Sequence, residues 1–388
     1  MKKRHFIQSL ASVALLACLS PVHAQTPSVD AHAVARHYAS LVYANYSDSL
    51  DAALVLQQAI QSFVAQPDAG KLQSAKQAWK QAREWYGQTE AYRFYAGPID
   101  DEKGPEGRLN AWPLDESYVD YVKGKPQAGI INNRQITISK ANLSRLNERG
   151  GEENIAAGWH AIEFLLWGQD KSDTGAGDRS PDDYLDDKAP NADRRRQFLL
   201  TATELLIDDL RYLVNAWAPA SRNYRASFEL GGIESVRKII VGLGSLSRGE
   251  LAGERMEVAI NTQDQEDEHS CFSDNTHRDI VNNALGIQNV WLGRYRRADG
   301  SLLQGPSLRD LVALKDTALA DKTTAQIATS LAAAQAIQAP FDREIIGGRD
   351  APGRQRIQAT INSLVQQSKD LVLAANAVGI QKLTLVQP

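Results

Sequence analysis

The sequence has very little cysteine, and this scarcity excludes a fold held together by disulfides. Only Cys18 and Cys271 occur among 388 residues, and Cys18 lies in an apolar segment at the N-terminus. Removal of that segment would leave Cys271 alone, so that no intramolecular disulfide could form. The fold must then be stabilised by a hydrophobic core, which a chain of this length readily provides.

The sequence also lacks an excess of charge of either sign. The 43 lysine and arginine residues are balanced by 47 aspartate and glutamate residues, for a net charge of −4. Such a balance predicts no broad basic face for nucleic acid. The densest basic cluster, Arg194 to Arg196, follows the acidic stretch Asp182 to Asp187, and we expect it to form a solvated helix start. Beyond the N-terminus, no stretch approaches the ~20 apolar residues of a membrane span.

The first 24 residues have the pattern of a secretory signal peptide. Residues 2–5 are basic or histidine, Phe6 to Leu19 is apolar, and Pro21 precedes small residues that end at Ala24. This order predicts export, with cleavage after Ala24. A second interpretation stays open, because the sequence LLAC ending at Cys18 resembles a lipobox and would give a lipid-anchored protein.

Strand-like alternation is almost absent, and helical periodicity dominates. The best alternating stretch, Arg134 to Ser139, is short. Helical spacing of apolar residues predicts an all-α protein of up-and-down bundles. The predicted helical segments include Asn154–Trp167, Ala192–Ala216, Arg248–Ile260, Asn275–Leu292, Ser307–Ala336 and Arg354–Ala377.

Loop composition suggests how the chain is divided. The polar stretch Ala218 to Ser227 lies near the midpoint and is our preferred boundary. It separates an N-terminal domain, residues 25–217, from a C-terminal domain, residues 218–388. The stretch Gly97 to Asp115 is predicted to be a structured connection. The long stretch Gly168 to Asp193, rich in Gly, Pro and Asp, is predicted to be an exposed loop.

One apolar segment, Gly158 to Gly168 (GWHAIEFLLWG), contains two ionisable residues. His160 and Glu163 are three positions apart, so a helix places both on one face. The segment is apolar nearly all round, which predicts a buried helix. Buried ionisable groups need a partner, and helix-borne imidazole and carboxylate groups at this spacing build metal sites in bundles. On the motif alone, a metal site and a plain hydrogen-bonded pair both stay open.

A second stretch, Gln265 to Asp279 (QEDEHSCFSDNTHRD), concentrates possible metal ligands. Acidic side chains, two histidines and a thiol are suitable donors for iron or zinc. The candidates are Glu268, His269, Asp274 and His277. The alternative is an acidic loop followed by a helix start, with Ser273 or Asp274 as the N-cap and His277 in the first turn.

A third stretch, Gln88 to Asp100, places Glu90 and Arg93 three positions apart. This spacing suits an intrahelical ion pair. It also suits a supporting role in which Glu90 helps to hold a metal site. No His-Glu-x-x-His motif of zinc proteases occurs in the chain, which weakens a simple peptidase interpretation.

The order of these motifs resembles the imelysin family. The resemblance is carried by Gly-x-His-x-x-Glu at residues 158–163, by TEAYRFYAGPID and NAWPLD before it, and by EDEHSCFSDNTHRDIVNNALG after it. It spans nearly the whole chain beyond the signal peptide. The family contains iron-regulated protein A-like proteins and proteins described as insulin-cleaving metalloproteinases.

The resemblance implies a fold, a location and a site. The fold would be two helical-bundle halves of a duplicated four-helix-bundle architecture, with the motif near their interface. The location would be the periplasm or outer membrane, with envelope iron-uptake components as partners. The cofactor would be a metal ion, with iron favoured over zinc. His160 and Glu163 match the motif, whereas Glu90 and the 266–279 cluster match segments whose roles the resemblance does not assign.

Three functions are therefore considered. We favour an exported iron-handling protein, in which one ion is bound by His160, Glu163, Glu90 and some of Glu268, His269, Asp274 and His277. The second is a zinc peptidase with His160 and Glu163 as ligands and Glu90 or Glu268 as the base; Glu163→Ala would then abolish chelator-sensitive proteolysis. The third is a module that binds a non-metal ligand or partner and merely contains a buried His160–Glu163 pair.

Overall fold

The computed structural model describes residues 29–385. The predicted signal peptide, its cleavage site and Cys18 lie outside these residues. In the described part, no helix is both long and apolar enough to cross a membrane. The strands of this part are β1 (Arg294–Arg296) and β2 (Leu302–Gln304), which form one antiparallel hairpin. The prediction of an all-α fold is confirmed.

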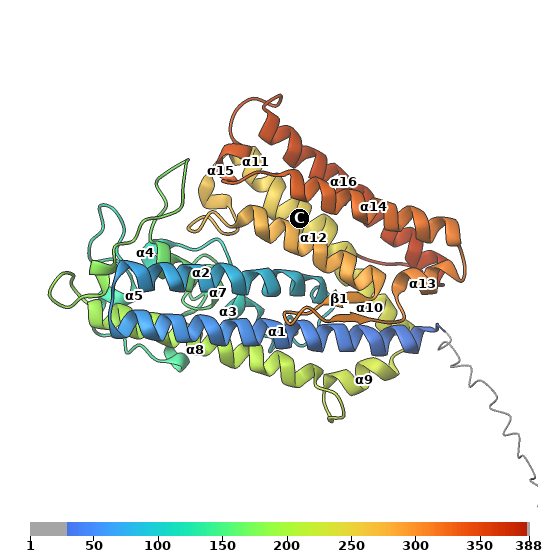
Figure 1. The fold of residues 1–388 in the computed structure, drawn as a ribbon, viewed down its shortest axis with the longest axis horizontal. Helices are drawn as coiled ribbons and strands as arrows, with labels where there is room; N and C mark the ends of the chain where they lie inside the picture. The colour runs from blue at the N-terminus through green and yellow to red at the C-terminus, as the bar shows by residue number, and fades with distance from the viewer. Residues whose placement is uncertain (1–28, 386–388) are drawn as a thin grey trace, which may run out of the picture.

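Four helices from the first half of the chain form a bundle along one side of the molecule (Figure 1). They are α1 (Ala31–Ala65), α2 (Ala69–Tyr86), α7 (Gly158–Trp167) and α8 (Ala192–Trp217). Helix α1 packs against α2 and α8, and α7 packs against the same two helices. The side chains of Asp30 and Asp68 accept backbone N–H groups and so fix where α1 and α2 begin.

The second half of the chain forms another bundle. Its helices are α10 (Ile233–Ser245), η3 (Leu246–Glu257), α12 (Thr276–Leu292), α14 (Thr317–Ala336) and α16 (Pro352–Ala377). Segment η3 continues α10 as a π-helix. Helix α16 packs against α14, α10 and η3, and α12 packs against α14. In Figure 1, α12 lies between the α14–α16 layer and the first bundle.

Shorter elements connect the long helices. They are η1 (Gly87–Tyr92), α3 (Glu106–Leu109), α4 (Glu116–Val119), α5 (Gly129–Asn132), α6 (Lys140–Leu146), η2 (Pro181–Tyr184), α9 (Tyr224–Leu230), α11 (Val258–Thr262), η4 (Gln265–Asp267), α13 (Leu308–Ala313) and α15 (Asp342–Ile345). The connection from Gly97 to Asp115 is structured, as predicted, and contains α3.

The two bundles meet where η1 packs against α12. Gly286 permits this contact, because a Cβ there would lie 2.3 Å from the carbonyl oxygen of Gln88. Asn289 Nδ2 also donates to Gln88 Oε1 at 2.9 Å, and Asn283 Nδ2 donates to the Gly87 carbonyl at 3.0 Å. Together these contacts hold η1 and α12 in a fixed position relative to each other.

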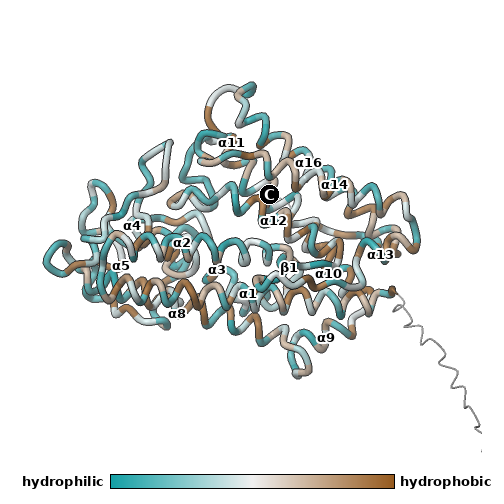
Figure 2. The backbone as a smooth tube through the Cα atoms, viewed as in Figure 1, coloured by the Kyte–Doolittle hydropathy of each residue, from teal (hydrophilic) through white to brown (hydrophobic). Residues whose placement is uncertain are grey.

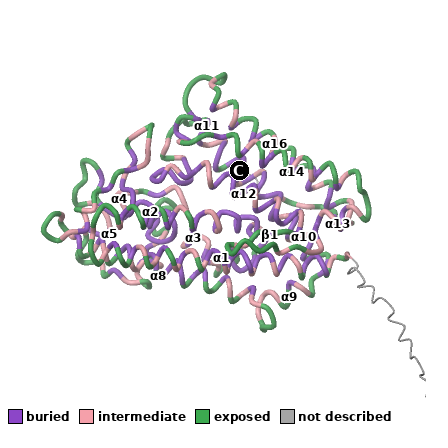
Figure 3. The backbone as a smooth tube through the Cα atoms, viewed as in Figure 1, coloured by how far each residue is buried: buried purple, intermediate pink, exposed green. Residues whose placement is uncertain are grey.

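One large hydrophobic core runs through both bundles of the described chain, beside a small second cluster of Leu41, Ala44 and Tyr295. One cluster of buried apolar side chains contains members from α1 to α16. Hydrophobic and hydrophilic residues alternate along the outer helices (Figure 2), and α12, at the centre, is mostly buried (Figure 3). Because the core is continuous, the division of the chain after residue 217 stays a prediction.

Arg134 to Ser139, the best alternating stretch, contains no strand. Two local interpretations of the sequence differ from the structure. The expected helix Ser307–Ala336 is two helices, α13 and α14, because Asp316 caps a new start by accepting the Leu319 N–H at 2.9 Å. Helix α12 begins after Asn275, without a side-chain cap from Ser273 or Asp274.

The cluster Arg194 to Arg196, which we expected to form a solvated helix start, also differs from that expectation. Helix α8 does begin there, but Arg195 is buried and donates to both oxygens of Asp120, at 2.6 and 3.0 Å. Arg179, from the loop expected to be exposed, donates to the same carboxylate at 2.9 Å. Burial of this ion pair network explains why part of the Gly168–Asp193 segment lies inside the protein.

Candidate metal site

Helix α7 carries the two ionisable residues of the motif into the core. The whole helix is buried, including His160 and Glu163. It begins at Gly158, whose φ of +80° favours glycine. A Cβ at this position would lie 2.5 Å from the carbonyl oxygens of Arg108 and Leu109. The glycine of the motif therefore allows α7 to start against the segment that contains α3.

We expect Gly158→Ala to destabilise the protein. Backbone strain alone costs about 1–3 kcal/mol, and the contact with two carbonyl oxygens adds to that cost. Urea unfolding measures the loss. Gly175→Ala is the matched control, since its Cβ would meet no atom within 4 Å. Equal stability of the two variants would contradict the role given to Gly158.

His160 and Glu163 contact each other, as their spacing predicts. His160 Nδ1 lies 2.8 Å from Glu163 Oε2. The other oxygen of Glu163 accepts the backbone N–H and the hydroxyl of Ser273, at 3.0 and 2.6 Å. Both carboxylate oxygens of Glu163 thus have hydrogen-bond partners, whereas His160 Nε2 is buried without one.

A second histidine from the other bundle completes a similar pair. The rings of His160 and His269 are in edge contact, with centroids 4.7 Å apart. His269 Nδ1 lies 2.9 Å from Asp279 Oδ2, so a carboxylate holds this ring also. Arg83 Nη2 donates to the other oxygen of Asp279 at 3.0 Å. The result is two imidazoles, each oriented through Nδ1 by a buried carboxylate.

Glu90 lies beside this pair but is strongly engaged. Arg93 Nη1 and Arg255 Nη2 both donate to its Oε2, at 2.6 and 2.9 Å. Asn110 Nδ2 lies 3.2 Å from Glu90 Oε1 and 3.4 Å from His269 Nε2, and so connects the two residues. The predicted Glu90–Arg93 ion pair is confirmed, although it lies at a 3₁₀ turn, η1, and its end.

The pKa values of these groups reflect burial and the surrounding charges. Burial lowers the pKa of His160 and of His269 well below the usual range, and Arg83 and Arg255, respectively, lower them further. Burial raises the pKa of Glu163 to about 8. Burial also opposes ionisation of Glu90, but Arg93 and Arg255 hold its pKa at about 2. Both imidazoles are therefore neutral at pH 7, which is the form that ligates metals.

An acidic pocket opens beside the site. Its volume is about 300 Å³, and Arg93, Asn110 and Trp112 form its inner wall. The Trp112 ring makes edge contact with His269, with centroids 5.2 Å apart. The remaining lining is largely glutamate, namely Glu106, Glu148, Glu152, Glu250 and Glu254. Such a wall attracts cations toward the two imidazoles.

The structure separates the predicted ligands into groups. His160, Glu163, His269 and Glu90 lie together, as described above. Glu268 and Asp274 belong instead to a group of carboxylates with Asp170 and Asp342. His277 lies in the first turn of α12, as expected, and is half-buried. No hydrogen bond or ion pair of the described residues links it to His160.

Several site residues were not singled out from the sequence. Arg83 and Arg255 lie on different helices, and nothing in their local sequence marks them. Asp279 ends the donor-rich stretch Gln265 to Asp279 but was not among the candidate ligands. Asn110 and Trp112 do lie in NAWPLD, one of the segments that carries the family resemblance. Ser273 was expected to cap α12, but both its hydroxyl and its N–H bind Glu163.

Comparisons with known proteins agree with the fold and the motif. Iron-regulated protein A of Synechococcus elongatus is 27% identical over 320 residues, which cover 80% of this chain and 76% of that protein. A crystal structure of a candidate iron-regulated protein A precursor from Parabacteroides distasonis has the same fold, with a TM-score of 0.70 and 18% identity over 92% of this chain and 97% of that one. The imelysin family profile matches residues 42–371. The chain therefore belongs to the imelysin family.

Proposed function

We propose that this protein binds iron as cargo between its two bundles, with His160 and His269 as the nitrogen ligands. The observation that carries the proposal is the pair of neighbouring imidazoles held through Nδ1 by Glu163 and Asp279. Carboxylates that fix a histidine in this way are typical partners of metal-bound histidines. Nε2 of each ring would be the ligand atom: that of His160 has no hydrogen-bond partner, and that of His269 would exchange its contact with Asn110 Nδ2 for the metal.

The buried, unpartnered Nε2 of His160 fits a metal ion well. A buried polar atom without a partner is costly, and a metal ion would remove that cost. An oxygen donor lies close by in Glu90 Oε1, which faces the same Asn110 amide group as His269 Nε2, so the ligand set would mix nitrogen and oxygen. Such a mixed set suits iron, whereas structural zinc sites are typically rich in thiolate ligands.

The geometry gives less support to a zinc peptidase. Glu90, one of the bases considered for that mechanism, is paired with two guanidinium groups and has a pKa of about 2. A carboxylate so stabilised is a weak base, because a general base works best with a pKa near the operating pH. Glu163 is held by Ser273 and His160. Binding without turnover is the function that these contacts favour.

We further propose that the protein acts in the cell envelope. The signal-peptide pattern of residues 1–24 supports export, either as a cleaved periplasmic protein or with a lipid anchor at Cys18 at the outer membrane. The relative named iron-regulated protein A supports an iron-related role. Envelope components of iron uptake would then be its partners.

Metal loading tests the proposal directly. Metal-free protein is offered Fe(II) without oxygen, Fe(III) citrate or Zn(II), and bound metal is quantified after dialysis. We expect about one iron per chain and no hydrolysis of an unfolded protein substrate. Exclusive zinc loading, with chelator-sensitive hydrolysis that Glu163→Gln abolishes, would establish the peptidase instead. Absence of any bound metal would leave a non-metal ligand-binding module.

The acidic pocket should control how fast iron enters. We expect Glu148→Gln, Glu152→Gln and Glu254→Gln together to slow association about tenfold at low salt, within the range of electrostatic steering, and less at high salt. All three side chains are exposed, so the fold should tolerate the changes. Stopped-flow quenching of Trp112 reports binding, because this ring contacts His269.

The matched control removes the same charge elsewhere. Asp51→Asn, Asp187→Asn and Asp350→Asn neutralise three exposed carboxylates outside the pocket. If both triple variants slow association equally, net charge and not the pocket would be responsible.

A further inference from the structure

Four carboxylates from both bundles form a second group close to the imidazole pair. This four-carboxylate cluster consists of Asp170, Asp274, Asp342 and Glu268. Oxygen atoms of the three aspartates all lie within 4.8 Å of one another. Glu268 lies beside Asp342, and the charges of Asp342 and Asp274 both act on it. Asp170 follows α7 in the first bundle, whereas the other three come from the second.

The cluster is buried and its charges are not balanced by the protein. Asp170 and Asp342 are each 3% exposed and Glu268 is 2% exposed. Among residues 29–385, no lysine, arginine or histidine forms an ion pair with any of the four. The nearest positive charges, Lys80 and Arg343, act on Asp274 and Asp342 only at longer range. Buried carboxylates elsewhere in this protein, such as Asp120 and Asp279, have arginine partners.

Six of the eight carboxylate oxygens of the cluster lack a hydrogen-bond partner. They are Asp170 Oδ2, Asp274 Oδ1, both oxygens of Asp342 and both oxygens of Glu268. Burial and the neighbouring Asp342 raise the pKa of Glu268 well above its usual range. Burial, Asp342 and Asp170 likewise raise the pKa of Asp274 to about 7. A positive charge bound among these four carboxylates would therefore stabilise them.

We propose that the four-carboxylate cluster is a binding site for a hard divalent cation, with Ca²⁺ as the ion that fits it best. Calcium takes six to eight oxygen ligands and accepts carboxylates in either one- or two-oxygen coordination. The cluster offers only oxygen, without the imidazole or thiolate donors that favour iron, copper or zinc. Its chemistry therefore differs from that of the His160–His269 site.

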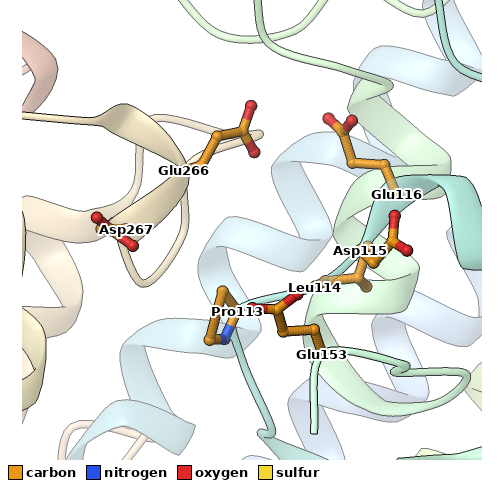
Figure 4. Close-up of a pocket in the computed structure, with 7 residues that line it drawn as sticks. All are labelled: Pro113, Leu114, Asp115, Glu116, Glu153, Glu266 and Asp267. Atoms are coloured by element: carbon orange, nitrogen blue, oxygen red, sulfur yellow. The ribbon is translucent and has the colours of Figure 1, made fainter. Parts of the chain in front are cut away.

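An acidic pocket lies near the cluster. It is lined by carboxylates from both bundles and has a volume of about 240 Å³. Figure 4 shows Glu116 on one side of this pocket and Glu266 on the other. The charge of Asp170 acts on Glu266, and Gln265 Nε2 donates to the Asp170 carbonyl at 2.9 Å. The pocket therefore adds negative charge beside the segment that carries Asp170.

The bound ion would fasten the two bundles together beside the imidazole pair. Asp274 directly follows Ser273, which binds Glu163, and Glu268 directly precedes His269. The loop that contains Glu268 and Asp274, the proposed ligands of the cation, thus also contains residues of the proposed iron site. The cation site does not depend on the iron proposal, since the two sites use different side chains.

Calcium titration of chelator-stripped protein tests the inference. We expect about one Ca²⁺ per chain by isothermal titration calorimetry and a higher melting temperature. Asp342→Asn should weaken Ca²⁺ binding at least tenfold, yet raise the melting temperature of the metal-free protein, because it removes one of the repelling charges. Asp170→Asn, in the first bundle, should likewise weaken Ca²⁺ binding at least tenfold and raise the melting temperature of the metal-free protein.

Two controls separate this site from the iron site. Asp350→Asn changes an exposed carboxylate of the segment after α15 and should bind Ca²⁺ like the unmodified protein. His160→Ala should also keep its Ca²⁺ binding. The inference fails if neither Ca²⁺ nor Mg²⁺ binds, if Asp342→Asn and Asp170→Asn bind Ca²⁺ normally, or if His160→Ala abolishes the binding. Failure of iron loading alone leaves it intact.

Discussion

His160→Ala should lower the affinity for iron by more than 100-fold. The substitution removes a proposed ligand, whereas loss of a residue that merely orients a ligand costs about 10–100-fold in affinity. Glu163→Gln is the matching orienting variant, because Glu163 Oε2 holds His160 Nδ1. We therefore expect affinities to fall in the order unmodified protein, Glu163→Gln, His160→Ala. Competition with a coloured iron chelator gives the three dissociation constants.

The control for this prediction is a histidine outside the site. His32 lies in the first turn of α1, is exposed, and contacts the Glu229 carbonyl. His32→Ala should bind iron like the unmodified protein. Circular dichroism of each metal-free variant verifies that the helices are intact. Stoichiometric iron of unchanged affinity in His160→Ala would contradict the proposed ligand.

Asp120→Asn should cost about 3–5 kcal/mol of unfolding free energy, the usual result of removing one partner from a buried ion pair. Asp120 is fully buried and neutralises Arg195 and Arg179. The substitution leaves two buried guanidinium groups without a counter-charge. It should leave iron affinity unchanged in protein that remains folded, because no hydrogen bond or ion pair of the described residues connects Asp120 to the imidazole pair. Urea unfolding and iron titration measure the two effects.

The control is a more exposed ion pair at the start of the same helix, between Arg196 of α8 and Asp186 in the segment before it. Asp186, whose side chain is 70% exposed, pairs with Arg196, and Asp186→Asn should cost at most about 1 kcal/mol. Equal stability of Asp120→Asn and Asp186→Asn would mean that the buried ion-pair network stabilises the fold no more than the Asp186–Arg196 pair does.

Acid should reduce the loss of unfolding free energy that Asp120→Asn causes. Burial opposes ionisation of Asp120, but Arg179 and Arg195 hold its pKa below the usual range. The stability that it contributes is therefore complete above the unfolded pKa of ~3.9 and is lost as the pH falls through the lower folded pKa. The difference between Asp120→Asn and the unmodified protein should narrow below about pH 4. A constant difference at all pH values would mean that packing, not charge, is responsible.

Much of the fold could be predicted from the sequence because helical periodicity is a local signal. The pattern indicated α7, α8, α12 and α16 within a few residues. It could not indicate that Arg248–Ile260 begins as a π-helix. Apolar residues mark a helix but not its hydrogen-bond spacing, and here buried Arg255 on η3 donates to Glu90 of the other bundle.

The site was predictable only where one segment carried the signal. His160 and Glu163 could be recognised because two ionisable groups in an apolar helix require an explanation. Residues such as Arg83 and Asp342 could not, because their roles depend on which helices meet in space. The interpretation of Ser273 as a possible N-cap fails for the same reason: its hydroxyl, which would have capped α12, binds Glu163, 110 positions earlier.

The distribution of the site over both bundles also has a consequence for biosynthesis. Glu163 leaves the ribosome well before Ser273, and Arg83 before Asp279, so the first bundle emerges with buried charges whose partners do not yet exist. At common elongation rates this interval is on the order of ten seconds. No nascent fragment that ends before α12 contains the complete site. The proposed iron site can therefore form only after the second bundle has been synthesised.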